Sequence, residues 1–175
     1  MKWSCKKSFL FSGILVVGIL ALLVMIWLPS YRKNRDLGRF YEEFGFSLPE
    51  DTYVLFKKIQ FGAMGDGSSL VIYQLSPDKM KKFTKISILK TWSELPINKE
   101  VYTELVGKIS NSDEEVTRHL SLGWQDGFYY IKDRFLSYDP ESKAKYGDES
   151  YRFQNFTLGI IDMKDNKIYL YRYNQ

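Results

Sequence analysis

The stretch Phe156–Gln175, FTLGIIDMKDNKIYLYRYNQ, decides the fold. Two runs rich in β-branched and aromatic residues flank the polar turn sequence KDN at 164–166, and this arrangement predicts an antiparallel hairpin. Side chains alternate between the two faces of a strand, so Ile168 and Leu170 share one face of the second run. The other face carries a row of tyrosines, Tyr169, Tyr171 and Tyr173.

Further strands are expected on the amino-terminal side of this hairpin. Thr52–Phe61 and Ser69–Leu75 are rich in β-branched and aromatic residues, and the first of them carries two lysines that we expect in solvent. Gly127–Asp139 predicts one long strand or two. Residues 139–151 are polar and contain proline and glycine, which predicts a loop. The segment 86–92 is compatible with a short strand or with a continued helix.

A short helix is expected before the first strand. Leu37, Phe40, Tyr41 and Phe44 follow helical spacing and form one apolar stripe. Gly45 can end this helix in the left-handed conformation. The stripe predicts that the helix docks on the globular domain.

Three more helices are expected between the strands. The first starts at Ser76 and Pro77, as N-cap and first helical residue. The second spans Asn98–Ile109. The third follows Ser112, which forms a capping-box pattern with Glu115. The residues expected to face the core are Met80, Phe83, Val101, Tyr102, Leu105, Ile109, Val116 and Leu120.

The segment Phe9–Leu28 contains no charged residue and predicts a membrane anchor. About twenty helical residues at 1.5 Å each match a bilayer core of roughly 30 Å. Trp3 and Trp27 lie near its ends, where indole side chains favour the membrane interface. The alternative is a cleaved signal peptide, whose apolar region is usually only about 7–15 residues long and ends in a small-residue cleavage site.

The order of these elements predicts an α+β fold, with an antiparallel sheet of about 4–6 strands and several short helices. We divide the chain into a short basic tail (1–8), a transmembrane anchor (9–28), a juxtamembrane stalk helix (29–46) and a globular α+β domain (47–175).

Basic residues flank the anchor on both sides, so the positive-inside rule is nearly balanced. They are Lys2, Lys6 and Lys7 before it and Arg32, Lys33, Arg35 and Arg39 after it. A signal-anchor behind a short basic tail commonly leaves that tail inside. We therefore expect a single-pass cell-membrane protein whose large carboxyl-terminal domain is extracytoplasmic.

The composition argues against nucleic-acid binding and against several kinds of metal site. Of the 25 basic residues three precede the anchor, which leaves 22 against 21 acidic ones in the rest of the chain. Cys5 is the only cysteine, which excludes an internal disulfide and a zinc site built on several cysteines. His119 is the only histidine, and its place near the end of an expected helix favours a surface or capping role. No cofactor is predicted.

The stretch Phe61–Leu70, FGAMGDGSSL, resembles a ligand loop in composition. A phosphate loop needs a lysine after its last glycine and a helix behind it, and a strand is expected here instead. A calcium loop needs several carboxylates, and Asp66 stands alone. A hairpin turn explains the stretch better, with Gly65 and Gly67 supplying positive φ and Asp66 an Asx turn. The ligand loop remains the alternative.

The expected function is non-enzymatic: binding or regulation of another macromolecule at the outer membrane surface, as an immunity-like protein would do. The partners would be membrane lipid, through the anchor, and a protein or glycan. Tyrosine is enriched at recognition surfaces, so the candidate binding residues are Tyr169, Tyr171, Tyr173 and Asp66. If helices cover that face of the sheet, the tyrosines are core residues instead.

Two alternatives remain. A carboxylate-dependent enzyme acting on an envelope substrate would use Asp66, Asp126 or Asp139 and would hold one of them in a pocket. An accessory subunit of a membrane complex would pack its anchor on a partner, but Gly13 and Gly18 are five residues apart rather than the four of G-x-x-x-G.

Overall fold

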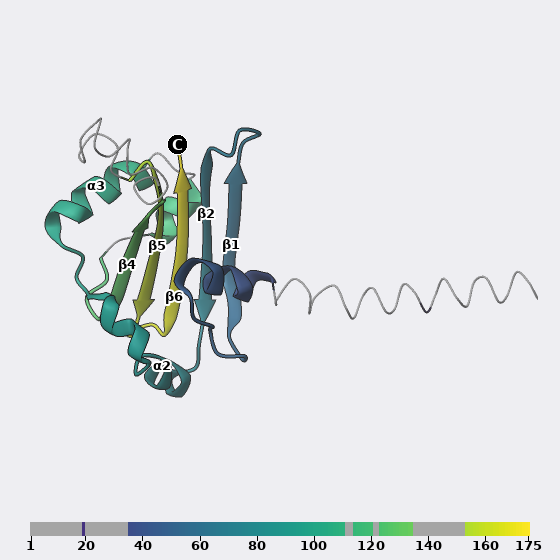
Figure 1. The fold of residues 1–175 in the computed structure, drawn as a ribbon, viewed down its shortest axis with the longest axis vertical. Coiled ribbons are helices and arrows are strands. Elements are labelled where there is room, and N and C mark those ends of the chain that lie inside the picture. The colour runs from purple at the N-terminus through teal and green to yellow at the C-terminus, as the bar shows by residue number, and fades with distance from the viewer. Residues whose placement is uncertain (1–18, 20–34, 111–113, 121–122, 135–152) are drawn as a thin grey trace, which may run out of the picture.

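The computed structural model describes residue 19 and residues 35–110, 114–120, 123–134 and 153–175 (Figure 1). They form one antiparallel sheet of six strands, in the order β1-β2-β6-β5-β4-β3, with helices on both faces. The expected α+β class with an antiparallel sheet is confirmed. The strands are β1 (Tyr53–Phe61), β2 (Gly67–Gln74), β3 (Ser93–Glu94), β4 (Gly127–Asp133), β5 (Asn155–Asp162) and β6 (Lys167–Asn174).

The carboxyl-terminal hairpin forms the centre of the sheet. Its strands β5 and β6 pair in register, for example Leu158 with Tyr171, and β6 also pairs with β2. Asp162 stabilises the turn, because its Oδ1 accepts hydrogen bonds from the backbone N–H groups of Lys164 at 3.1 Å and Asp165 at 3.3 Å. A local sequence pattern therefore supplies the two strands on which the others assemble.

The stretch between β1 and β2 is a hairpin loop, as expected. The Gly62 N–H donates to the Asp66 carbonyl at 2.7 Å. Gly65 has φ +87° and Gly67 has φ +133°, which confirms the expected positive φ at both. A Cβ on Gly67 would lie 1.9 Å from the Gln60 carbonyl oxygen, so no larger residue fits there.

The helices begin and end close to the predicted positions. Residues 35–44 form the first, which we call the entry helix, and Gly45 ends it at φ +77°. The segment 86–92 contains a short 3-10 helix rather than either of the two forms considered. The remaining helices are α2 (Pro77–Phe83), the 3-10 helix η1 (Ser87–Thr91), α3 (Lys99–Ile109) and α4 (Glu114–His119).

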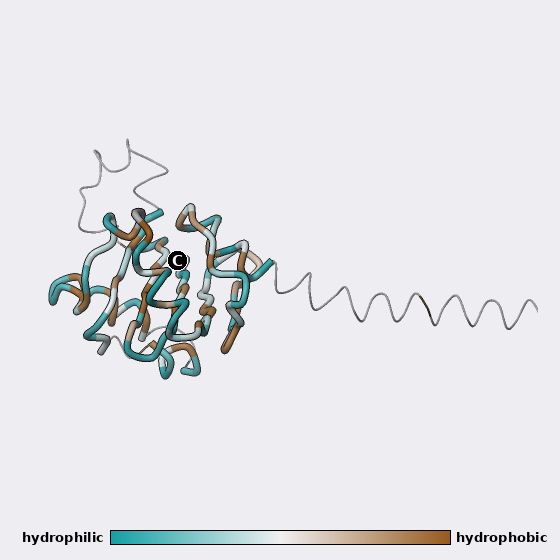
Figure 2. The backbone as a smooth tube through the Cα atoms, turned by 90° about the horizontal axis from the view of Figure 1, so that it is seen from below, coloured by the Kyte–Doolittle hydropathy of each residue, from teal (hydrophilic) through white to brown (hydrophobic). Residues whose placement is uncertain are grey.

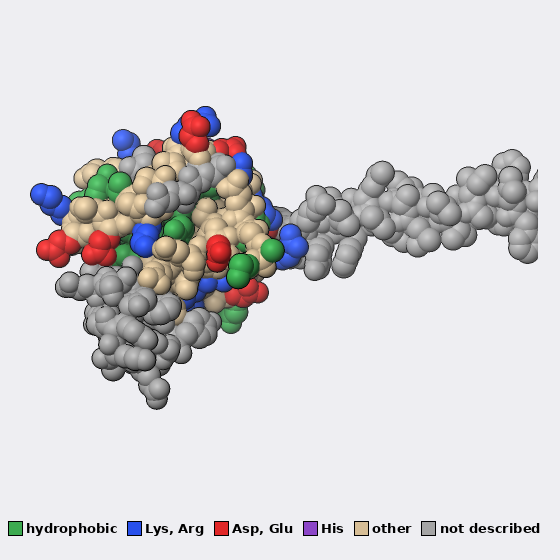
Figure 3. All heavy atoms as spheres, turned by 90° about the horizontal axis from the view of Figure 1, so that it is seen from above, with side chains coloured by type: hydrophobic (Ala, Val, Ile, Leu, Met, Phe, Trp, Pro, Cys, Tyr) green, Lys and Arg blue, Asp and Glu red, His purple; other side chains and the backbone are tan. Residues whose placement is uncertain are grey.

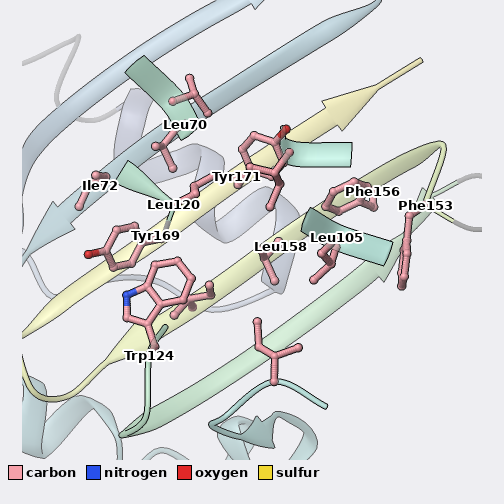
Figure 4. Close-up of a cluster of buried hydrophobic side chains, with 14 of the residues drawn as sticks. Leu70, Ile72, Leu105, Leu120, Trp124, Phe153, Phe156, Leu158, Tyr169 and Tyr171 are labelled. Atoms are coloured by element: carbon pink, nitrogen blue, oxygen red, sulfur yellow. The ribbon is translucent and has the colours of Figure 1, made fainter. Parts of the chain in front are cut away.

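Two hydrophobic cores lie on opposite faces of the sheet. Figure 2 shows hydrophobic stretches interspersed with hydrophilic ones along the backbone of the domain. The first core joins α3 and α4 to Leu70, Leu158 and the tyrosine face of β6 (Figure 4). The second core joins the entry helix and α2 to the face that carries Ile168 and Leu170. The expected division of β6 into two faces is therefore confirmed.

The predicted inward faces of the helices are confirmed with two exceptions, and the first is Tyr41, which belongs to the predicted stripe of the entry helix but is 55% exposed. Met80, Phe83, Leu105, Ile109, Val116 and Leu120 are buried, and Val101 packs against the first core. Tyr102 is 37% exposed, so its predicted burial is wrong. The apolar stripe of α3 is wide enough on a helical projection to include Tyr102, but the face that meets the sheet is narrower.

Among the described residues, no helix is long and apolar enough to cross a membrane. The predicted anchor lies outside those residues apart from Ile19, and so does the loop predicted at 139–151.

Candidate functional site

The tyrosine row lies on a covered face of the sheet. Tyr171 is fully buried and Tyr169 is 6% exposed, while Tyr173 is half-buried against the same core. Trp124 packs on Tyr169 with ring centroids 4.9 Å apart and donates a side-chain hydrogen bond to its hydroxyl (Figure 4). Burial raises the pKa of the Tyr169 hydroxyl. Tyr169 and Tyr171 are therefore core residues and do not form a binding surface. This is the alternative expected from the sequence if helices cover that face of the sheet.

Asp66 lies in the exposed loop 62–66. In the part of the chain that the structure describes, its carboxylate has no hydrogen-bond partner. The loop is held to the end of β6, because the Asn174 side-chain amide donates to the Gly65 carbonyl at 3.0 Å. A shallow pocket of about 320 Å³ lies beside it and includes Arg134 and Asn155 in its lining. The Asx turn expected of the Asp66 side chain is absent from this described loop.

The carboxylates of the enzymatic alternative do not form one site. Asp66 precedes Gly67, which pairs with Asn174 at the end of β6. Asp126 precedes Gly127, the first residue of β4, and Gly127 pairs with Asp162. Asp162 in turn pairs with Lys167, the first residue of β6. The two carboxylates therefore lie at opposite ends of the sheet and both are exposed. Asp139 lies outside the described residues.

His119 is an exposed residue at the end of α4, and its ring lies 4.1 Å from that of Phe56. This position agrees with the surface role expected of it. Within the described ranges, no three His, Cys, Asp or Glu residues are grouped closely enough to hold a metal ion.

A groove of about 280 Å³ runs between the entry helix and the strands β1, β2 and β6. Val71 and Leu170, which are 2% and 5% exposed, form its apolar floor. Ile59 and Phe61 on β1 form the outer wall. The rim is polar and consists of Arg39, Glu42, Glu43, Ser69 and Arg172.

Glu43 fixes the inner end of this groove. Its carboxylate lies 3.5 Å from Arg172 and 3.7 Å from Lys132, and accepts a hydrogen bond from the Thr157 hydroxyl at 3.1 Å. The Nε of Arg172 is buried and has no hydrogen-bond partner among the described residues. The entry helix is therefore joined by one carboxylate to three strands, and one donor at the rim is left unsatisfied.

The remaining two rim charges have no ion-pair partner among the described residues. Arg39 is half-buried and Glu42 is exposed on the entry helix. Nearby, burial raises the pKa of the Tyr73 hydroxyl, which donates a hydrogen bond to the Asp36 carbonyl at 2.7 Å. The groove thus offers an apolar floor with one cation and one anion available at its rim.

The outer strand β1 has an unusual surface. Tyr53, Leu55, Ile59 and Phe61 are each between 37% and 54% exposed. The two lysines expected in solvent are instead half-buried and paired: Lys57 with Asp36 at 2.5 Å and Lys58 with Glu115 at 2.7 Å. Within the described chain, no strand pairs with the outer side of β1.

Sequence reasoning missed both the groove and the apolar edge. The groove is built from one helix and three strands that are distant in sequence, so no local motif encodes it. The edge had one signal, the run of large apolar residues in Tyr53–Phe61, but its lysines were assigned to solvent. Comparison of the chain with family models, with curated proteins and with solved structures gives no match.

Proposed function

We propose that the chain is a membrane-anchored, non-enzymatic binding protein that holds a partner protein at the membrane surface, in the groove beside the entry helix. The predicted anchor at 9–28 attaches it to the membrane, and the globular domain lies on the extracytoplasmic side. The observation that carries the proposal is the groove itself, where an apolar floor is framed by charged side chains.

The size and lining of the groove favour a protein partner over a small molecule. Small-molecule pockets usually enclose about 300–1,000 Å³. The groove, at about 280 Å³, lies at the lower limit of this range, and this volume suits one or two side chains of a protein. An apolar side chain on Val71 and Leu170, with polar contacts at the rim, is a typical interface anchor.

The two alternatives gain no support from the site. The enzymatic alternative needs a carboxylate in a pocket with catalytic neighbours, and Asp66 and Asp126 are exposed at opposite ends of the sheet. The accessory-subunit alternative depends on contacts of the anchor, which lies outside the described residues.

The test is photo-crosslinking of the full chain in its native membranes. A photo-reactive residue at Glu42, on the groove rim, should give a discrete crosslinked protein. The matched control is Glu100, an exposed glutamate on α3. Adding Arg39→Glu should weaken crosslinking from Glu42 about tenfold, because it reverses one charge at the interface. Lys99→Glu, an equal change of charge on α3, should leave it unchanged.

Equal crosslinking from Glu42 and Glu100 would refute the groove as the binding site. Crosslinking from Glu42 that persists in full with Arg39→Glu would show that the partner does not use the rim. Circular dichroism of each variant establishes that the domain remains folded.

A further inference from the structure

The apolar surface of the domain is concentrated on β1 and the loop that follows it. Eight large hydrophobic side chains are exposed among the described residues of the domain. Five of them belong to β1 and the 62–66 loop, and we call this set the β1 edge: Tyr53, Leu55, Ile59, Phe61 and Met64. Met64 is 91% exposed. Figure 3 shows hydrophobic side chains at the surface beside the point where the chain enters the domain.

The β1 edge lacks the usual protection of an outer strand. Lysines on such strands normally prevent pairing with other chains, because their charges must stay in water. Here Lys57 and Lys58 turn onto the two faces of the sheet, where carboxylates of the same domain neutralise them. An apolar edge of this kind normally has a covering partner.

The length of the chain before the domain limits what that partner can be. Six residues, 29–34, separate the end of the predicted anchor from the entry helix. Fully extended, six residues span at most about 20 Å. The start of the entry helix is itself fixed to β1, through the contact of Asp36 with Lys57 at 2.5 Å. An anchor at 9–28 would therefore hold the β1 edge close to the bilayer.

We infer that the β1 edge rests on the lipid headgroup layer, with its aromatic and aliphatic side chains in the membrane interface. Aromatic and aliphatic side chains favour this region, and its water and headgroups satisfy the backbone groups of an outer strand. Arg35, which is exposed in the first turn of the entry helix, would meet anionic headgroups.

This orientation rests on the membrane anchor of the proposed function, but it is independent of the proposed groove partner. It places the groove immediately above the bilayer, since Ile59 and Phe61 belong both to the β1 edge and to the outer wall of the groove. A domain held in this way would present its groove to membrane-associated proteins.

The experiment uses the full chain with Cys5→Ser, reconstituted in vesicles of phosphatidylcholine and phosphatidylglycerol. Single cysteines at Met64 and Ile59 carry an environment-sensitive fluorophore, which is quenched by spin-labelled lipid or by aqueous iodide. Val106 on α3 is the matched control, since it is 39% exposed against 41% for Ile59 (α3 and β1 lie on opposite sides of the domain in Figure 1). Met64→Cys lies in an exposed loop, so this variant should fold.

We expect quenching by the spin-labelled lipid to be about threefold stronger at Met64 and Ile59 than at Val106, because interfacial residues lie within a few ångströms of the headgroups. Equal quenching at the three positions would overturn the inference. Shielding of Ile59 from iodide without quenching by lipid would overturn it too, because a protein strand or a second copy would then cover the edge. Neither result bears on crosslinking from Glu42, so the two proposals can fail separately.

Discussion

Lys57 Nζ, in the middle of the outer strand β1, lies 2.5 Å from Asp36 Oδ1 in the first turn of the entry helix. Asp36 is 6% exposed, and its carbonyl also accepts the hydroxyl hydrogen bond of Tyr73. These two contacts join the point where the chain enters the domain to β1 and β2. They therefore fix both the β1 edge and the groove relative to the start of the entry helix.

Asp36→Asn should lower the free energy of unfolding by about 1–2 kcal/mol, because it leaves the half-buried Lys57 without a countercharge. The loss is at the lower end for buried pairs, since the Lys57 side chain is 26% exposed. Asp51→Asn is the control: its pair with Lys79 is 3.5 Å long and exposed, and it should change stability by less than about 0.5 kcal/mol. Urea unfolding of the full chain in detergent measures both, and equal losses would show that the Asp36 contact has no special role.

Gly159→Ala should destabilise the domain by about 1–3 kcal/mol through overpacking. A Cβ at Gly159, in the central strand β5, would lie 2.6 Å from ring atoms of both Phe44 and Trp92. Gly107→Ala is the matched control, because a Cβ at Gly107 in α3 would have nothing within 4 Å, and it should stabilise by about 0.5–1 kcal/mol. Opposite signs in thermal unfolding are expected, and a loss at both positions would contradict the open space at Gly107.

Tyr171→Ala should cost about 3–5 kcal/mol, because it empties a fully buried site in the first core. Tyr102→Ala, at a tyrosine that is 37% exposed on α3, should cost less than about 1 kcal/mol. Loss of partner binding on Tyr171→Ala would therefore report unfolding rather than a contact surface. If the two variants unfolded at the same urea concentration, the burial of the tyrosine row would be in doubt.

The fold was predictable where a local pattern determines it. The alternation in β6 and the turn before it predict the central hairpin, and glycine chemistry predicts the loop between β1 and β2. The pairing of β6 with β2 was not predictable, because Leu70 and Tyr171 meet across about a hundred residues of intervening chain. Sequence alternation also assigns two faces to β6 without showing which elements cover each face.

The candidate site was harder to predict, for a physical reason. A lysine on a strand is expected in solvent unless a carboxylate from elsewhere meets it, and Asp36 and Glu115 do so only in the folded domain. The groove likewise depends on where the entry helix ends over β5 and β6. Side-chain type alone cannot show either arrangement, since both are properties of long-range packing.

Asp66→Asn should leave both stability and partner binding unchanged, within about 0.5 kcal/mol, as is usual for exposed surface positions. The Asp66 side chain has no hydrogen-bond partner in the described structure, and the loop is closed by backbone contacts. Gly67→Ala is the contrasting change and should destabilise the domain. The Cβ of the alanine would collide with the Gln60 carbonyl, and a φ of +133° is strained for alanine. Loss of crosslinking from Glu42 in a folded Asp66→Asn variant would restore the loop as a binding site.

Asp162→Asn should stabilise the domain increasingly as the pH rises. Burial raises the pKa of the Asp162 carboxyl above its ordinary value of 3.8, and the negative charge of Asp165 adds to the rise. Backbone hydrogen bonds from Asp165 and Lys164 and the positive charge of Lys167 lower this pKa, but burial is the largest effect. The folded state thus binds this proton more tightly than the unfolded state, and wild-type stability falls as the pH rises from about 4 through the raised pKa.

Asparagine at position 162 keeps the oxygen that accepts hydrogen bonds from the backbone N–H groups of Lys164 and Asp165, but it cannot ionise. Its advantage should therefore grow across that window in urea unfolding between about pH 4 and pH 7. Asp162→Ala cannot ionise either, so its stability should follow the same pH trend as that of Asp162→Asn but lie about 1–2 kcal/mol lower, because the two turn hydrogen bonds are lost. Parallel pH profiles for Asp162→Asn and the wild type would show that the carboxyl carries no such penalty.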